Sequence, residues 1–303
     1  MKEKFREVKL SKPNLELLNL INSIIKEYQA DGYVLTLRQL YYQLVSRDVI
    51  PNKQREYAKI SNLLKEGRMS GIVDWNAIED RLRFPKKPPS WDNPKDIVES
   101  AAEQFALDRM EGQENYIEVW VEKDALSGVL SRITNKYHIR LMVNRGYSSV
   151  SAMYDAYKRF SQNRQNIDSP VYVIYLGDFD PSGLDMIRDI DERINEFDKG
   201  FDGGLWHDDF NFTVKPVALT MDQIEEYNPP PNPAKISDPR AKDFIKKYGG
   251  TSWEVDALKP NVLNSILEGT ILSLIDVDKY NEIVKKEQGM KKDIKNLTKY
   301  LKV

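Results

Sequence analysis

The chain has 303 residues, of which 41% are hydrophobic and 30% charged, and its formal net charge at pH 7 is -2. This length exceeds the usual size of one hydrophobic core, so it predicts two domains. The absence of cysteine excludes disulfide bonds and zinc–thiolate sites, and the near-neutral charge leaves any nucleic-acid surface to local clusters of basic residues.

Composition also limits the chemistry that the chain can perform. Its two histidines, His138 and His207, stand far apart in sequence, which argues against a multi-histidine metal site or a histidine-based catalytic triad. Catalysis must therefore use carboxylate, tyrosine, serine or lysine side chains. No apolar run is long enough to span a bilayer and the N-terminus does not resemble a secretory signal, so we expect a cytoplasmic protein without a membrane partner.

The first third of the chain has the apolar spacing of helices. Pro13 opens a first helix that ends at Asp31, and Thr36 opens a second one. Gln39 follows Thr36 by three residues, which is the spacing of a capping box. A third helix is predicted over residues 53–68.

A short apolar segment follows the third helix. Residues 72–75 predict a strand pair, and three helices with such a pair are typical of a helix-turn-helix or winged-helix module. The proline-rich and lysine-rich run at 84–90 cannot continue a helix, so we expect a domain boundary there. The predicted division is a mainly helical winged-helix domain at 1–90 and a second domain at 91–303.

The third predicted helix is rich in basic side chains, which are suited to phosphate contacts. These candidate DNA-binding residues are Lys53, Arg55, Lys59, Lys65 and Arg68. Glu56 and Glu66 lie among them, so the alternative interpretation is a solvated helix face.

The second part of the chain alternates between strand and helix patterns. Strands are predicted at 116–121, 139–143 and 171–176, and helices at 124–136 and 149–162. Such alternation is typical of a parallel sheet that helices cover. In open sheets of this kind, ligands bind beyond the carboxyl ends of the strands.

Three acidic residues stand at those predicted strand ends. Glu122 follows the first strand, and Asp178 and Asp180 follow the third. Carboxylates placed that close together repel one another unless a hard divalent cation such as Mg²⁺ or Mn²⁺ joins them. The alternatives are a helix N-cap for Asp180, which precedes Pro181, and a surface ion pair between Glu122 and Lys123.

These motifs resemble a known family. A strand that ends in Glu122 and a later Asp-x-Asp-Pro-x-Gly segment at 178–183 are similar to the Toprim domain of topoisomerases, primases and related nucleases. The form of the second motif is most like that of topoisomerase VI A subunits and the meiotic double-strand-break proteins related to them. The Arg-x-x-Tyr-Tyr motif at 38–42, and more loosely the segments 218–227 and 253–258, resemble the same group. The resemblance implies a Rossmann-like parallel sheet with helices on both faces, a C-terminal helical extension and a preceding winged helix.

Two lines of argument select Tyr42 as the candidate nucleophile. Tyr41 falls on the apolar stripe of its helix, whereas Tyr42 lies about 100° further round, beside Arg38. The resemblance independently assigns the nucleophile to the second tyrosine of the pair. A phenol is a weak nucleophile at neutral pH, so Arg38 or a metal ion would have to stabilise the phenolate.

The resemblance implies a transesterification reaction. Tyr42 would attack a DNA phosphodiester and form a 5′-phosphotyrosyl bond, while Glu122, Asp178 and Asp180 hold Mg²⁺. It also implies a homodimer, in which the tyrosine of one subunit meets the acids of the other, and a separate ATPase subunit, because this chain has no evident ATP-binding loop.

Alternatives to that reaction remain open from the sequence. One is a hydrolytic Toprim endonuclease without a covalent intermediate, and another is a DNA-binding regulator with an inactive metal site. Tyr42 would then pack against the next domain or contact a phosphate. Arg145, near a predicted helix start, is a further candidate for phosphate binding.

Overall fold

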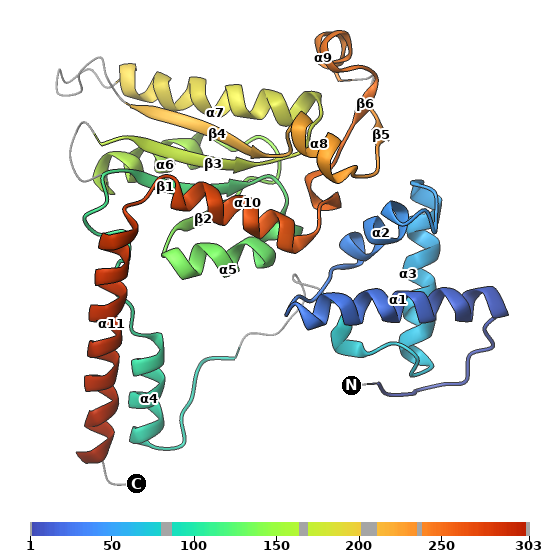
Figure 1. Ribbon diagram of the computed structural model, residues 1–303, viewed down its shortest axis with the longest axis horizontal. Helices are drawn as coiled ribbons and strands as arrows, with labels where there is room; N and C mark the ends of the chain where they lie inside the picture. The colour runs from blue at the N-terminus through green and yellow to red at the C-terminus, as the bar shows by residue number, and fades with distance from the viewer. Residues whose placement is uncertain (1, 80–86, 164–168, 201–210, 235–237, 301–303) are drawn as a thin grey trace.

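The computed structural model describes residues 2–79, 87–163, 169–200, 211–234 and 238–300 (Figure 1). The N-terminal elements are α1 (Lys12–Ala30), α2 (Leu37–Ser46), α3 (Gln54–Met69) and the 3₁₀ turn η1 (Trp75–Ala77). The three predicted helices are thus confirmed. The capping box at the start of α2 is present as well, since Thr36 and Gln39 exchange side-chain to backbone hydrogen bonds.

The predicted strand pair at 72–75 is wrong within the described residues. The backbone N–H groups of Ile72 and Val73 both donate to the carbonyl of Gly67, at 2.9 and 3.0 Å. They therefore close the C-terminus of α3 instead of entering a β-ladder. In residues 2–79 the only β-pairing consists of single bridges, Lys4 with Ser70 and Leu35 with Ile78.

The N-terminal helices share one buried cluster of side chains. A Cβ atom at Gly67 of α3 would lie 2.8 Å from the Leu18 side chain of α1, so glycine is what lets these two helices approach closely. The cluster includes Ala257 from the C-terminal half of the chain. The helices therefore pack against the rest of the molecule as well as against one another.

A four-stranded parallel sheet forms the centre of the second part. Its strands are β1 (Tyr116–Val121), β2 (Arg140–Val143), β3 (Val171–Leu176) and β4 (Phe212–Ala218), in the order β2-β1-β3-β4. The strands predicted at 116–121 and 171–176 are confirmed at those bounds, and the one predicted at 139–143 is one residue shorter. The parallel sheet among helices is consistent with a Rossmann-like α/β fold.

Helices cover both faces of this sheet. On one face, alternate residues of β1 pack with α5 (Ser127–Tyr137) and α10 (Pro260–Leu272). On the other, Trp120 and the alternate residues of β3 pack with α6 (Val150–Asn163) and α7 (Pro181–Gly200). Strands with both faces buried explain the nearly continuous apolar runs in the sequence.

The remaining elements extend this α/β unit. They are η2 (Asp124–Leu126), α8 (Met221–Tyr227), β5 (Asn232–Pro233), α9 (Ala241–Tyr248), β6 (Thr251–Ser252), η3 (Val255–Ala257), η4 (Thr298–Tyr300), and the pair α4 (Pro94–Gln104) and α11 (Val277–Leu297). The long helix α11 packs along α4 and projects from the sheet (Figure 1). None of the described helices is both long and apolar enough to cross a membrane.

Candidate functional site

The carboxyl ends of β1 and β3 bring Glu122 and Asp178 into contact. The two strands are neighbours, with Val121 beside Leu176 in the register, so the residues that follow them leave the sheet at the same edge. The backbone N–H of Asp178 donates to Glu122 Oε2 at 3.0 Å. One oxygen of Glu122 is thereby fixed by the neighbouring strand.

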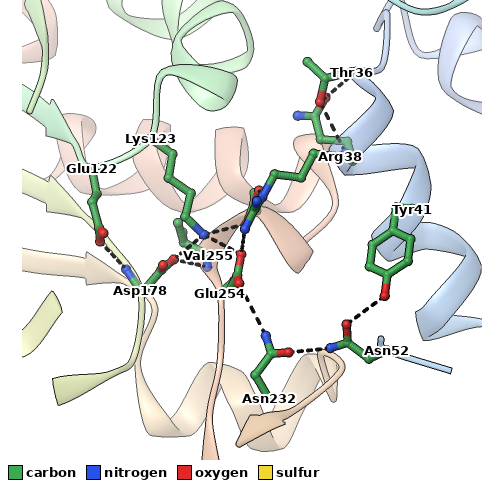
Figure 2. A network of polar contacts seen from close by, with 12 residues as sticks. Thr36, Arg38, Tyr41, Asn52, Glu122, Lys123, Asp178, Asn232, Glu254 and Val255 are labelled. Atoms are coloured by element: carbon green, nitrogen blue, oxygen red, sulfur yellow. Dashed lines mark hydrogen bonds and ion pairs between the residues drawn. The ribbon is translucent and has the colours of Figure 1, made fainter. Parts of the chain in front are cut away.

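Asp178 and Asp180 are each anchored through one carboxylate oxygen. Asp178 Oδ1 accepts from the backbone N–H of Val255 at 2.9 Å (Figure 2). Asp180 Oδ1 accepts from the backbone N–H of Gly183 at 2.7 Å, so it caps the start of α7. A Cβ atom at Gly183 would lie 2.1 Å from the Asp178 carbonyl oxygen, which explains why the turn needs glycine there.

Lys123 supplies a cation that the sequence did not identify as part of the site. Its Nζ atom lies 2.8 Å from Asp178, 2.8 Å from Glu254 and 2.9 Å from Asp256 (Figure 2). The Asp256 side chain is completely buried. Two acids in the otherwise apolar stretch Trp253–Leu258 were the available signal, because buried carboxylates require cationic partners.

Burial and pairing act in opposite directions on these carboxyl groups. Burial raises the pKa of Asp178 to about 7 and also raises the pKa of Glu122, which lies near Asp180. Burial alone would raise the pKa of Glu254 too, but Lys123 and Arg38 lower it to about 2. Negative charge is therefore stabilised at Glu254, which has two cationic partners, and disfavoured at Asp178 and Glu122.

The site as a whole has more negative than positive groups. Five carboxylates (Glu122, Asp178, Asp180, Glu254 and Asp256) share two cations, Lys123 and Arg38. In the part of the chain that the structure describes, no group of three or more acidic or histidine side chains is placed so that it could hold a metal ion. The ammonium group of Lys123 occupies the point where three of the five carboxylates meet.

Arg38 connects the N-terminal helices to this acidic cluster. Its Nε atom donates to Asp256 at 2.6 Å, and its Nη2 atom donates to Glu254. Although burial opposes the charge, these two carboxylates raise the pKa of the guanidinium further above its ordinary value. Arg38 therefore stays charged and forms an ion-paired bridge between α2 and the segment 254–256.

Tyr42 lies beside Arg38, as the helical spacing predicts, but it is buried against the second part of the chain, which is the alternative that the sequence left open. Its side chain is only 4% exposed, because η3 covers the face of α2 that α1 and α3 leave free. The Tyr42 side chain lies close to the carboxylate of Glu254, and the Arg38 guanidinium lies 5.6 Å from its ring centre. Burial, followed by the charge of Glu254, raises the pKa of Tyr42, so the phenol is protonated in this arrangement.

A chain of polar contacts continues from the acids to α2. Glu254 Oε1 accepts from Asn232 at 3.5 Å, and Asn232 accepts from Asn52 at 2.7 Å (Figure 2). Asn52 in turn accepts from the hydroxyl of Tyr41 at 3.0 Å. Tyr41 is buried, as its place on the apolar stripe predicts.

The predicted basic residues occupy different environments. Lys53, Arg55, Lys59 and Lys65 are exposed, and Lys59 pairs with Glu56 at 2.6 Å. The Arg68 guanidinium instead donates to the carbonyls of Trp75 and Ile78, at 3.0 and 2.6 Å. It holds the end of the N-terminal region in place.

Arg145 lies at the same edge of the sheet as the acids. Its backbone N–H donates to the carbonyl of Glu122 at 3.0 Å, and its exposed side chain is 3.4 Å from Asp124.

A scan of the chain against protein-family models finds no match, and a search among curated proteins finds none either. The function therefore has to be argued from these side chains.

Proposed function

We propose that the chain is a Toprim protein with an N-terminal helix-turn-helix module, and that it binds DNA and cleaves it with the help of Mg²⁺ or Mn²⁺. The observation that carries the proposal is the convergence at one sheet edge of two groups of residues. Glu122, Asp178 and Asp180 follow β1 and β3 there. A polar network through Lys123 joins Glu122 and Asp178 to Arg38 of α2, and Tyr42 lies near the same network at Glu254.

The carboxylate oxygens of the site are the donors that a hard divalent cation prefers, although the described side chains are not arranged around such an ion here. Glu122, Asp178 and Asp180 would hold it, because each has one oxygen anchored by the backbone and a second for which the described residues offer no hydrogen bond. An ion bound there neutralises the excess negative charge of the cluster and supplies positive charge to the scissile phosphate. The unequal numbers of carboxylates and cations favour this assignment over a purely structural cluster.

The other side chains have roles in binding and proton transfer. The exposed basic side chains of α3 and Arg145 contact the phosphate backbone of the DNA. Glu254 lies near the Tyr42 hydroxyl and Arg38 lies over its ring, so both are close enough to act on the phenol when it attacks. In the family that the chain resembles, cleavage of both strands needs a homodimer, and strand passage depends on a separate ATPase subunit. Tyr42 must move away from η3 to reach a phosphate.

A specific observation favours a second candidate, hydrolytic cleavage with water as the nucleophile. Tyr42 is buried near Glu254 of its own chain, which is how a purely structural tyrosine lies. The third candidate, a DNA-binding regulator, gains support from Lys123, whose ammonium group already neutralises part of the acidic cluster.

One experiment separates the three candidates. Supercoiled and end-labelled DNA is incubated with the full chain and Mg²⁺ or Mn²⁺, stopped with denaturant, and analysed with and without protease. The variants are Tyr42→Phe and Asp178→Ala, and Asp293→Ala on the exposed side of α11 is the matched control.

Each result has one meaning. Label that stays with the protein until proteolysis, and is lost in Tyr42→Phe, supports transesterification. Free ends that persist in Tyr42→Phe and disappear in Asp178→Ala support hydrolysis. DNA binding without any cleavage, equal in all variants, supports the regulator and contradicts the enzyme.

A further inference from the structure

A pocket of about 550 Å³ opens between the N-terminal helices and the start of η2. Its volume lies in the range of ordinary ligand sites. Its walls come from the start of α2, from one side of α3 and from Asp124 and Ala125. None of the three proposed metal ligands lines it, so it is distinct from the acidic cluster.

The pocket nevertheless adjoins the acidic cluster along two routes. Arg38, which lines the pocket, donates hydrogen bonds to Glu254 and Asp256. Asp124, which also lines it, is two residues from Glu122 in the chain. A nucleotide that placed its phosphate near the acids would therefore have this pocket within reach of its base.

The lining combines apolar, aromatic, basic and acidic side chains, the acidic ones being Glu79 and Asp124. Leu37, Leu64 and Ala125 contribute apolar walls, and Tyr57 contributes an aromatic ring. The exposed ammonium group of Lys65 provides positive charge at the pocket. This combination matches a nucleotide, because a base stacks on aromatic and apolar surfaces while its phosphate pairs with a cation.

We infer that this pocket receives the base of one unpaired nucleotide of the DNA substrate. A base within a duplex is stacked on both sides and cannot enter a pocket, so the nucleotide has to be extruded or already unpaired. The inference rests on the proposed function for the identity of the ligand as DNA. It adds a preference for DNA in which a base next to the cleavage site is extrahelical.

Binding without cleavage tests the inference. Fluorescence anisotropy in the presence of EDTA compares three labelled duplexes: one fully paired, one with a single extra nucleotide, and one with an abasic extra nucleotide. The last two share the same backbone distortion and differ only in the base. We expect the base-containing bulge to bind about tenfold more tightly than the abasic one, as expected for stacking of one base.

Two variants assign the preference to the pocket. Ser61→Trp places a large ring in the cavity, and Tyr57→Leu removes the stacking surface without filling it. Both should abolish the preference and retain binding of the paired duplex. Ser23→Trp, the same change at an exposed serine of α1, is the control and should keep the preference. If Ser61→Trp fails to fold by circular dichroism, Tyr57→Leu decides.

The outcomes separate this inference from the proposed function. Equal binding of the three duplexes by the wild type overturns the base pocket and leaves DNA binding intact. A preference that survives in both pocket variants overturns the assignment to these residues. Binding of none of the three duplexes overturns the DNA-binding function together with the pocket.

Discussion

Two buried charge clusters lie at opposite ends of the sheet and differ in balance. At the amino end, Glu287 of α11 accepts from Arg109 at 2.7 and 3.1 Å and from the backbone N–H of Leu107, and it lies 3.1 Å from Lys291. One carboxylate there has two cationic partners. At the carboxyl end, five carboxylates share Lys123 and Arg38.

The difference indicates which cluster has a role beyond structure. A buried ion pair with complete hydrogen bonding joins elements and needs nothing more, as Arg109 and Glu287 join α11 to the loop before β1. An unbalanced cluster destabilises the fold unless a further cation compensates it. Such a cost is typical of sites that bind a ligand, and the raised pKa of Asp178 belongs to the unbalanced cluster only.

The largest expected effect concerns the unbalanced cluster. Glu122→Gln removes one negative charge and keeps an oxygen for the backbone N–H of Asp178. We expect Mg²⁺-dependent nicking of supercoiled DNA to fall about a thousandfold, because a ligand that stabilises transition-state charge is lost. DNA binding should be unchanged. Glu103→Gln, at the exposed end of α4, is the matched control, and nicking at the wild-type rate in Glu122→Gln would contradict the proposal.

Replacement of Lys123 should destabilise the fold, because it increases the excess of negative charge in this cluster. Lys123→Met leaves Asp178, Glu254 and Asp256 without their shared partner, and we expect a loss of about 4 kcal/mol in the free energy of unfolding. Mg²⁺ should restore part of it, because an ion can then neutralise these acids.

Urea unfolding with and without Mg²⁺ measures both effects. Lys136→Met is the control, since Lys136 pairs with Glu268 at the surface and its loss should cost less than about 1 kcal/mol. If Mg²⁺ stabilises neither the wild type nor Lys123→Met, the carboxylates do not attract a divalent cation.

The balanced cluster should affect stability alone. Glu287→Ala leaves Arg109 without its carboxylate, and we expect a loss of about 3 kcal/mol in the free energy of unfolding. DNA cleavage at a temperature where the variant is folded should equal that of the wild type. A large loss of cleavage in the folded variant would remove the distinction between the two clusters.

The contribution of Glu287 to stability should depend on pH within a defined range. The hydrogen bonds from Arg109 lower the pKa of Glu287 to about 2, from an ordinary value of 4.5. A carboxyl group with a lowered pKa in the folded state stabilises the fold above its ordinary pKa, and this stabilisation is lost as the pH falls toward the folded value. Glu287→Gln should therefore show a weaker decline in stability between about pH 4.5 and 2 than the wild type in urea titrations. Equal slopes for the two proteins would contradict the assignment.

The elements that the sequence predicts well are those with local causes. The capping box at Thr36 and the apolar runs of β1 and β3 depend on neighbouring residues, and their bounds agree with the structure. The placement of Glu122 beside Asp178 also followed from the sequence, because adjacent parallel strands end at the same edge.

The features that could not be predicted from the sequence depend on contacts between residues far apart in the chain. Lys123 meets Asp256 across 133 positions, so nothing near Lys123 indicates its partner. The burial of Tyr42 was not decided by the sequence, because helical periodicity reports one apolar stripe, whereas α2 is covered on two sides. Residues 72–75 were predicted as strand because a short apolar run has the same pattern in a strand and in a buried turn.

The smallest expected effects concern two basic side chains of α3, one exposed and one hydrogen-bonded to the backbone. Lys59→Ala at the exposed start of α3 should weaken DNA binding by less than about 1 kcal/mol and lower the slope of log K against log salt by about one, since one phosphate contact is lost. Arg68→Ala should instead lower the free energy of unfolding, because two backbone carbonyls lose their donor. Anisotropy titrations at several salt concentrations measure the slope. If it stays unchanged when Lys53, Arg55 and Lys59 are all replaced by alanine, the DNA contacts another surface, and Arg145 at the edge of the sheet becomes the residue from which to locate it.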